Sequence, residues 1–446
     1  MVHRRFSTLC ERVAVLTALV SLFGVTGGCR SSDEAQGDRT PRRVAAMDEA
    51  DPTAAARLTI DAEDVATVQL HVTGSEVEPP VIDMTGQGTL TLSFDVIADR
   101  GRPLSVYFYH ADRSWRRDLS PAEYLDTYHR DDILNYQSSQ ATEVQFVHYD
   151  YEFPNNAIDF RISGNYVVRV SESGDEDEVL FERAFFVTEQ SVPVDVALEN
   201  VLVSQSNFPA VQPTAVFTPL PETQANFSDY SVCFSRGGRL SEVRCASDPS
   251  LMRQPALEFY LQPGSSFAPE GGEYLLDLSV LQPGGQIELL DVTSSPFAVV
   301  LAPDYIRFGA DDLSQRLNGQ AVVAEVVRDV VDPDTQAEYV ETEFSLVTEG
   351  DSKLAGAVYL VGAFTGWQPQ ERGLMAWNDV EKRYTARMLL KQGRYEYRYT
   401  SANSRSREAL SQSLPRSGDV FVALVYYRDI YVQTDRLVGM GSGRMF

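Results

Sequence analysis

The sequence predicts an all-β protein made of tandem immunoglobulin-like β-sandwich domains, with one short helix inserted in the first domain. The main signal is the alternation of apolar and polar residues in runs such as "TLTLSFDVIA", "LSVYFYHA" and "NYVVRVSE". Alternation with period two, rich in β-branched and aromatic residues, is typical of strands that bury one face. Turn residues recur at short intervals between these runs, which is the spacing seen in β-sandwiches.

The length of 446 residues exceeds what one hydrophobic core supports, and 43% apolar residues suffice for several packed domains. The composition and the turn pattern predict six segments: a signal peptide over 1–28, a flexible tether over 29–56, a first β-sandwich over 57–190, a second over 191–303, a connector over 304–335, and a third β domain over 336–446. The glycine-rich end, "GMGSGRMF", is expected to be flexible.

The formal net charge of −26 argues against nucleic acid as a partner, because no cluster of basic residues stands out to meet phosphates. The chain has only three lysines, Lys353, Lys382 and Lys391, and its other basic residues are arginine or histidine. We therefore expect no nucleic-acid partner.

The expected helix lies in "LSPAEYLDTYHRDDILNYQ". Ser120 has the side chain of an N-cap, Pro121 occupies the first helical position, and Glu123 follows three residues after the cap. This spacing is a capping box, in which the serine and the glutamate satisfy backbone N–H groups at the start of a helix. A short helix or helical turn is predicted here.

The N-terminus carries a targeting signal. A basic start, "MVHRRFSTLCER", precedes an uncharged run from Val13 to Gly28, which is shorter than the about 20 residues of a membrane span and typical of a signal-peptide core. The "TGGC" that follows resembles the lipobox of bacterial lipoproteins, although Thr26 stands where leucine is usual. The resemblance implies that Cys29 carries the lipid and holds the protein on the periplasmic side of the outer membrane. An ordinary cleaved signal peptide is the alternative.

Two cysteines remain in the folded part, Cys233 and Cys245, on strand-like runs separated by Gly237 and Gly238. A hairpin would bring the two sulfur atoms onto neighbouring strands. In an oxidising compartment we expect a disulfide between them. Without a histidine nearby, the pair cannot complete a closed zinc site.

The stretch "VHYDYEFPNN" places His148, Asp150 and Glu152 on one face of a predicted strand. Such a face could coordinate a metal, but the other histidines lack the spacing of a ligand set. We expect a solvated sheet face, no metal site and no cofactor. The sequence also lacks a nucleophile elbow and a phosphate-binding loop, so we expect no enzymatic activity and assign no catalytic residues.

Several motifs together resemble the plug proteins of the bacterial type IX secretion system. In the first domain these are Glu123-Tyr124-Leu125, Asn135-Tyr136-Gln137, His148-Tyr149, Phe153-Pro154-Asn155 and Ser163-Gly164-Asn165-Tyr166. Later matches are "LNGQAVVAEV", "DPDTQAEYVETEFSL", "VYLVGAFTGWQ", "LLKQGRYEYRY" and "VYYRDIYVQTDRLVG". The resemblance implies a non-enzymatic stack of β-sandwiches that binds the outer-membrane translocon barrel and seals its pore.

The third domain also resembles early-set immunoglobulin-like modules that bind glycogen or starch. That resemblance implies that Trp367 stacks on a sugar ring, that Arg398 donates a hydrogen bond to it, and that Trp377 adds a second aromatic surface. The second tryptophan usual in those modules is missing from "TSANSRSRE". A lipid-anchored glycan-binding protein is therefore the alternative function, and the other role for Trp367 is to anchor a loop.

Overall fold

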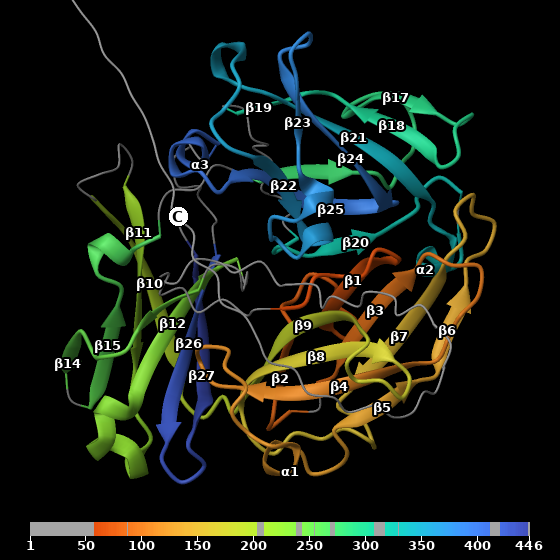
Figure 1. Ribbon diagram of the computed structural model, residues 1–446. Helices are drawn as coiled ribbons and strands as arrows, with labels where there is room; N and C mark the ends of the chain where they lie inside the picture. Colours follow the sequence, from red (N-terminus) through yellow and green to blue (C-terminus); the bar gives the residue numbers. More distant parts are fainter. Residues whose placement is uncertain are drawn as a thin grey trace, which may run out of the picture. The chain divides into compact units, whose positions relative to one another are not determined.

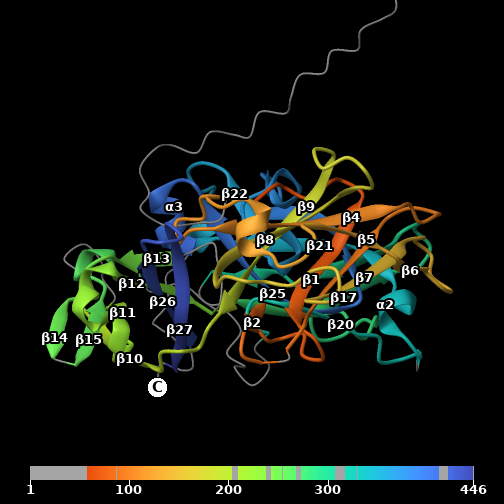
Figure 2. The same ribbon diagram turned by 90° about the horizontal axis from the view of Figure 1, so that it is seen from below.

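The computed structural model describes residues 58–86, 88–202, 209–237, 243–253, 255–267, 273–306, 317–328, 330–410 and 420–444. Strands dominate these ranges and form six sheets, which pack in pairs as three β-sandwiches (Figures 1 and 2). The all-β prediction is confirmed. None of the described helices combines the length and the apolar character needed to cross a membrane.

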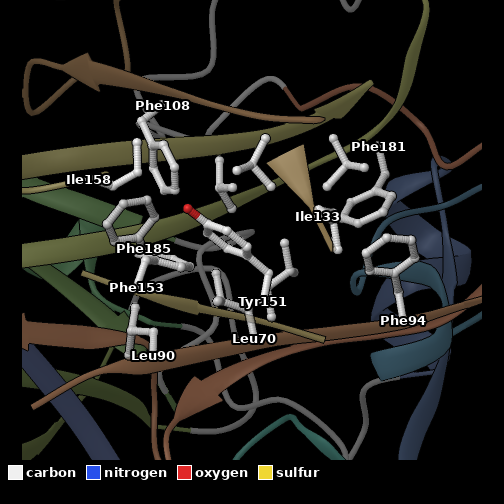
Figure 3. Packing of buried hydrophobic residues seen from close by; sticks show 14 of the residues in the cluster. Leu70, Leu90, Phe94, Phe108, Ile133, Tyr151, Phe153, Ile158, Phe181 and Phe185 are labelled. Carbon is white, nitrogen blue, oxygen red and sulfur yellow. The ribbon is translucent and has the colours of Figure 1, made fainter. Parts of the chain in front are cut away.

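The first sandwich contains two antiparallel-rich sheets that enclose an aromatic core. One sheet has the order β1 (Val65–Val72), β3 (Leu90–Val96), β7 (Val147–Phe153), β6 (Asn135–Ser138). The other has the order β2 (Val81–Asp83), β9 (Val179–Thr188), β8 (Gly164–Glu172), β4 (Leu104–Ala111), β5 (Arg130–Ile133). Figure 3 shows two groups of aromatic rings in this core, Phe108, Phe153 and Phe185 on one side and Phe94 with Phe181 on the other.

The predicted helix is a single turn, α1 (Pro121–Tyr124). Its capping box is formed as expected, because the Glu123 carboxylate accepts hydrogen bonds from the Ser120 N–H at 2.8 Å and from the Ser120 hydroxyl at 2.7 Å. Tyr124 is buried in the first core and donates a hydrogen bond to the Phe108 carbonyl at 2.7 Å. The turn therefore closes one end of the first sandwich.

The second sandwich has its own core between two four-stranded sheets. The first sheet runs β10 (Val194–Val201), β11 (Ala210–Phe217), β15 (Ala256–Tyr260), β14 (Leu251–Arg253). The second sheet runs β13 (Val243–Ala246), β12 (Tyr230–Arg236), β26 (Val420–Asp429), β27 (Thr434–Arg444).

The third sandwich pairs a sheet centred on β25 (Gly393–Ser401) with a six-stranded sheet. The partners of β25 are β16 (Tyr274–Asp277), β20 (Ala321–Val323) and β22 (Val358–Gly362). The six-stranded sheet contains β17 (Ile287–Asp291), β18 (Phe297–Leu301), β21 (Tyr339–Val347), β24 (Arg383–Lys391), β23 (Ala376–Asn378) and β19 (Asp304–Tyr305). Helices α2 (Pro333–Gln336) and α3 (Ser404–Leu410) accompany it.

The strand pairing differs from the expected domain boundaries. The segment 274–301 was assigned to the second domain, but β16 pairs with β25 and β18 pairs with β21 in the third sandwich. The segment 420–444 was assigned to the third domain, but β26 pairs with β12 over seven residue pairs in the second. The expected connector 304–335 contributes β19 and β20 to the third sandwich. The third sandwich is thus inserted in the second. Period-two patterns identify strands but do not specify their long-range partners.

The expectation of a flexible C-terminal tail is wrong over residues 439–444, because they continue strand β27. Gly439, Gly441 and Gly443 alternate along this strand and face the backbone at and just before β10. A Cβ atom at Gly441 would clash with the carbonyl oxygen of Val194, and one at Gly443 would lie 2.8 Å from that of Val196. Glycine therefore lets the two sheets of the second sandwich approach closely at this edge.

Substituting Gly441→Val should lower the free energy of unfolding by about 1–3 kcal/mol, because the new side chain overpacks the contact with β10. The matched control is Ser442→Val on the same strand, since Ser442 is exposed and points to the other side. Urea unfolding monitored by tryptophan fluorescence and circular dichroism measures both. Equal stability of the two variants would contradict the close-approach explanation.

Candidate functional site

The first sandwich contacts both of the others, and its two interfaces differ in character. Toward the second sandwich the backbone N–H of Glu189 bonds the Leu437 carbonyl at 3.0 Å, and that of Val192 bonds the Val438 carbonyl at 3.1 Å. The Tyr426 hydroxyl donates to the buried Asn165 side chain at 2.6 Å. An apolar cluster that includes Phe186, Cys233, Leu424, Tyr426 and Leu437 fills this interface. The second sandwich is thus attached by backbone hydrogen bonds, apolar packing and polar side-chain bonds, among them Arg436 to the Glu189 carboxylate at 2.7 Å.

Toward the third sandwich the contact centres on a buried ion pair between Asp95 of β3 and Lys391 of β24. The Lys391 Nζ atom lies 2.6 Å from Asp95 Oδ2, and both side chains have no exposed surface. The Tyr339 hydroxyl, from β21, donates to the same carboxylate oxygen at 2.6 Å. On the other side, His148 Nδ1 lies 2.7 Å from Asp95 Oδ1. We call Asp95, His148, Tyr339 and Lys391 the charged network.

The charged network satisfies the groups that it buries. Both Asp95 oxygens accept hydrogen bonds, and Lys391 also donates to the carbonyl of Asp334. The ammonium group lies 4.3 Å from the centre of the Phe146 ring, a cation–π contact. An unpaired buried charge costs several kcal/mol, and pairing together with hydrogen bonds offsets that cost. The network therefore fixes the two sandwiches in one relative position.

The protonation states follow from these contacts. Burial opposes ionisation of Asp95, but the field of Lys391 and the hydrogen bond from His148 outweigh it and lower the pKa of the carboxyl below its usual value. Burial disfavours a charged His148, yet its hydrogen bonds to Asp150 and Asp95 raise its pKa to about 10. The charged Asp95 carboxylate stabilises the folded state, and this stabilisation is lost as pH falls through its lowered pKa. The charged His148 imidazolium also stabilises the folded state, and this stabilisation is lost as pH rises through about 10. Both are present at neutral pH.

His148 corrects an expectation from the sequence. The face of β7 that holds His148, Asp150 and Glu152 was expected to be solvated, but His148 is 5% exposed, Asp150 is half-buried and only Glu152 of the three is exposed. The third sandwich covers this part of the face, through the ion pair described above. His148 Nε2 also lies 3.2 Å from Asp150 Oδ1. The alternating pattern identified the strand and the face but could not reveal a second sandwich packed on it.

The titratable groups of the network are engaged with one another. The His148 imidazole bonds to the Asp95 carboxylate on one side and to Asp150 on the other. Over the described ranges, no set of three or more histidine, cysteine, aspartate or glutamate side chains is placed to hold a metal ion. The arrangement suits a structural contact between sandwiches.

The predicted disulfide between Cys233 and Cys245 is present, and the two residues are directly opposite each other on β12 and β13. Cys233 is buried and belongs to the apolar cluster between the first and second sandwiches. The disulfide therefore stabilises β12, which contributes Cys233 to the interface between the first and second sandwiches. The proposed lipid-attachment residue, Cys29, lies outside the described residues.

The three residues expected for glycan binding are not arranged as an open platform. Trp367 is only 8% exposed, and its indole N–H donates to the Gly319 carbonyl at 2.7 Å. Arg398 lies over the Trp367 ring at 5.9 Å. Trp377 is half-buried, packs edge-on against Tyr384 and donates to Asp379. Trp367 thus anchors a loop, which is the other role that the sequence suggested for it. The glycan-binding alternative therefore loses the residue on which it mainly depended.

The sequence analysis did not identify Asp95, Tyr339 or Lys391 as site residues. A usable signal was present, because Asp95 interrupts the apolar end of a strand in "LSFDVI" and Lys391 follows the apolar "MLL". Charged residues at such positions are rarely fully buried unless they are paired. Their pairing with each other, 296 residues apart, follows only from the tertiary structure.

Substituting Lys391→Met should lower the free energy of unfolding by about 3–5 kcal/mol, because it leaves the Asp95 carboxylate buried without its ammonium partner. The matched control is Lys382→Met, since Lys382 is exposed, and we expect a change within about 0.5 kcal/mol. Urea titration of both variants provides the comparison. A Lys391→Met variant as stable as the wild type would show that the ion pair has no net role.

Comparison with known proteins adds three findings about the chain. A solved structure of a hypothetical protein from Parabacteroides merdae matches with a TM-score of 0.78 and 23% identity, covering 87% of this chain and 98% of that one. This similarity shows a shared fold. A search of curated proteins finds no match. A family model described as "Type 9 secretion system plug protein 1st domain" matches residues 65–189. The resemblance noted in the sequence is thus confirmed for the first sandwich, where residues 65–189 match this family model.

Proposed function

We propose that this protein is a non-enzymatic periplasmic plug subunit, which binds and seals the outer-membrane translocon barrel of a type IX protein secretion system. The observation that carries the proposal is the match of residues 65–189 to the plug-protein first domain. That domain is also the one that contacts both other sandwiches. A partner that binds the first sandwich would therefore also hold the other two, because both are attached to the first.

The arrangement of the three sandwiches suits a protein that acts by binding a partner over a large surface. Sealing a wide pore requires a body that keeps its shape, and the charged network and the apolar cluster hold the sandwiches together. The first sandwich also presents large side chains to solvent beside its edge strands β5 and β6: Tyr128, Leu134 and Tyr136 are 72%, 86% and 44% exposed. Tyrosine is enriched in the buried centres of protein interfaces. These residues are available to a protein partner.

An enzymatic role has no support in the part of the chain that the structure describes. Two buried histidines bond to carboxylates, His148 to Asp95 and His110 to Asp118 at 2.8 Å, and the buried His71 bonds to the Val72 carbonyl. Such pairs orient secondary structure when no nucleophile or open site lies next to them. Lipid attachment at Cys29 would keep the folded part close to the outer membrane, which complements a role at a barrel in that membrane.

The plug assignment predicts that the tagged full-length chain, purified from detergent-solubilised envelopes, carries one large outer-membrane barrel protein with it. Mass spectrometry identifies the partner. The matched control is residues 1–57 fused to an unrelated globular domain, which keeps the targeting segment and the tether but lacks the sandwiches. Deleting the gene should also make the outer membrane permeable to a large antibiotic.

Recovery of the same barrel with the control fusion, or a deletion strain with an intact permeability barrier, would contradict sealing by the sandwiches. Because the two readouts are independent, a barrel partner without leakage would support binding and reject sealing.

Lipid attachment is tested by Cys29→Ser, which should move the protein from the membrane fraction to the soluble periplasmic fraction. The matched control is Cys10→Ser, because Cys10 lies inside the expected signal peptide and should not affect fractionation. Immunoblots of separated membranes and soluble extract give the result. Membrane association that survives Cys29→Ser would refute the anchor.

A further inference from the structure

Strand β6 forms an open edge of the first sandwich. In the sheet order β1-β3-β7-β6 it pairs only with β7, and all four of its residues are exposed. The Ser139 N–H donates to the Phe146 carbonyl at 2.8 Å, so the backbone groups of Tyr136 and Ser138 point away from β7, as alternation along an antiparallel strand requires. Within the described ranges, no strand pairs with that outer side. The edge can therefore accept one further strand.

The sequence of β6 lacks the features that usually protect such an edge. Exposed edge strands commonly carry charged residues or proline, which prevent pairing with another chain. The edge strand β5 carries Arg130, Asp131 and Asp132, and the edge strand β17 carries Glu288 and Asp291. In contrast, residues 133–142, "ILNYQSSQAT", contain no charge and no proline in a chain whose formal net charge is −26. The open edge is therefore competent to pair with another chain.

Two exposed apolar side chains, Leu134 and Tyr136, accompany this edge. The Tyr136 ring lies 5.1 Å from the buried Tyr149 ring, and it covers Gly101, where an added Cβ atom would lie 2.5 Å from it. These contacts hold the Tyr136 ring in place before any partner arrives. A tyrosine that is already ordered contributes contact area at a low entropic cost.

The uncharged run continues into the contact with the third sandwich. The Gln140 N–H donates to the Thr335 carbonyl at 2.9 Å, and the Arg328 guanidinium donates to the Ala141 carbonyl at 3.3 Å. The segment around Arg328 also exposes three aliphatic side chains, Val326, Val327 and Val331. Helix α2 follows this segment, and both views show α2 beside β6 at the end of the molecule away from the second sandwich (Figures 1 and 2). Apolar residues of both sandwiches thus border the open edge.

Carboxylates lie at both ends of the uncharged run. Asp132 precedes it and Glu143 follows it, and both are exposed. Asp150 lies opposite Asn135 on β7. Arg130 is bound to Asp132 at 3.0 Å, so the cation at this end is already paired. A strand that docks here meets backbone and apolar groups along its middle and negative charge at its ends, which favours lysine or arginine at the ends of the partner strand.

We propose that β6 is the docking edge for the translocon barrel, and that an extended periplasmic segment of the barrel protein adds to the sheet as the strand next to β6. The segment has apolar residues in its middle and basic residues at its ends. This inference rests on the proposed function and names the surface and the chemistry of the contact. An edge with outward N–H and C=O groups is matched by another extended backbone, and the side chains beside it add specificity.

The backbone pairing is tested by Ser138→Pro, which removes an outward N–H group and places the proline ring there. Proline is tolerated on an edge strand when its nitrogen faces away from the sheet. The tagged full-length chain is purified from detergent-solubilised envelopes, and quantitative mass spectrometry measures the barrel protein recovered per mole of tagged chain. We expect about tenfold less barrel protein with Ser138→Pro. The matched control is Ser138→Ala, which keeps the N–H group and should recover the wild-type amount.

A second variant tests the side chains and the charge. Leu134→Lys places a cation where the partner strand is expected to be apolar or basic, and it should also reduce recovery about tenfold. Val380→Lys is its matched control, because Val380 is as exposed as Leu134 and lies in the turn between β23 and β24 of the third sandwich. Urea midpoints equal to that of the wild type show that each variant is folded. Should Ser138→Pro fail to fold, Leu134→Lys provides the test.

The occupant of the edge is identified by replacing Tyr136 with the photoreactive p-benzoylphenylalanine in cells. Irradiation should cross-link the chain to a barrel peptide that has apolar residues flanked by lysine or arginine. Wild-type recovery of the barrel that Ser138→Pro leaves unchanged would overturn the docking edge and leave the plug function standing. No barrel with the wild type would reject the plug function and this inference together. A cross-link between two copies of this chain would assign the edge to self-association and would also overturn the inference.

Discussion

The Asp95 carboxylate is the group on which the arrangement of this molecule depends. It is fully buried and binds one residue from its own sandwich, His148, and two from the third, Lys391 and Tyr339. A charge in that position is stable only while all its partners are in place. The network is accompanied by other bonds across the same interface, such as the Gln140 N–H to the Thr335 carbonyl at 2.9 Å and the Glu143 N–H to the Glu338 carboxylate at 2.8 Å. Together these bonds set the relative position of the two sandwiches.

The second sandwich is attached to the first through a different set of contacts. The Glu189 N–H donates to the Leu437 carbonyl, and Arg436 binds the Glu189 carboxylate through two bonds of 2.7 and 2.8 Å. An apolar cluster and a disulfide support the same region. Both interfaces of the first sandwich thus combine backbone hydrogen bonds with polar side-chain bonds, and toward the third sandwich the ion pair between Asp95 and Lys391 is completely buried.

Local features of this fold were predictable from the sequence, and features that depend on distant partners were not. The alternating runs identified strands, Ser120 and Glu123 identified the helical turn, and the hairpin around Gly237 identified the disulfide. The sequence did not predict that β26 and β27 belong to the second sandwich, because an alternating pattern identifies a strand but not the strand with which it pairs. His148 was wrongly expected to be exposed for the same reason, because the solvent exposure of a sheet face depends on whether another domain packs against it.

The most direct measurement of this account is a double-mutant cycle between Asp95→Asn and Lys391→Met, with unfolding free energies from urea titration for the wild type, both single variants and the double variant. Because the two residues belong to different sandwiches, their coupling energy reports on the interface itself. The account predicts that the double variant is more stable than the sum of the two single losses implies, with a coupling of about 1–3 kcal/mol. Additive losses, with a coupling near zero, would contradict the claim that this ion pair holds the sandwiches together.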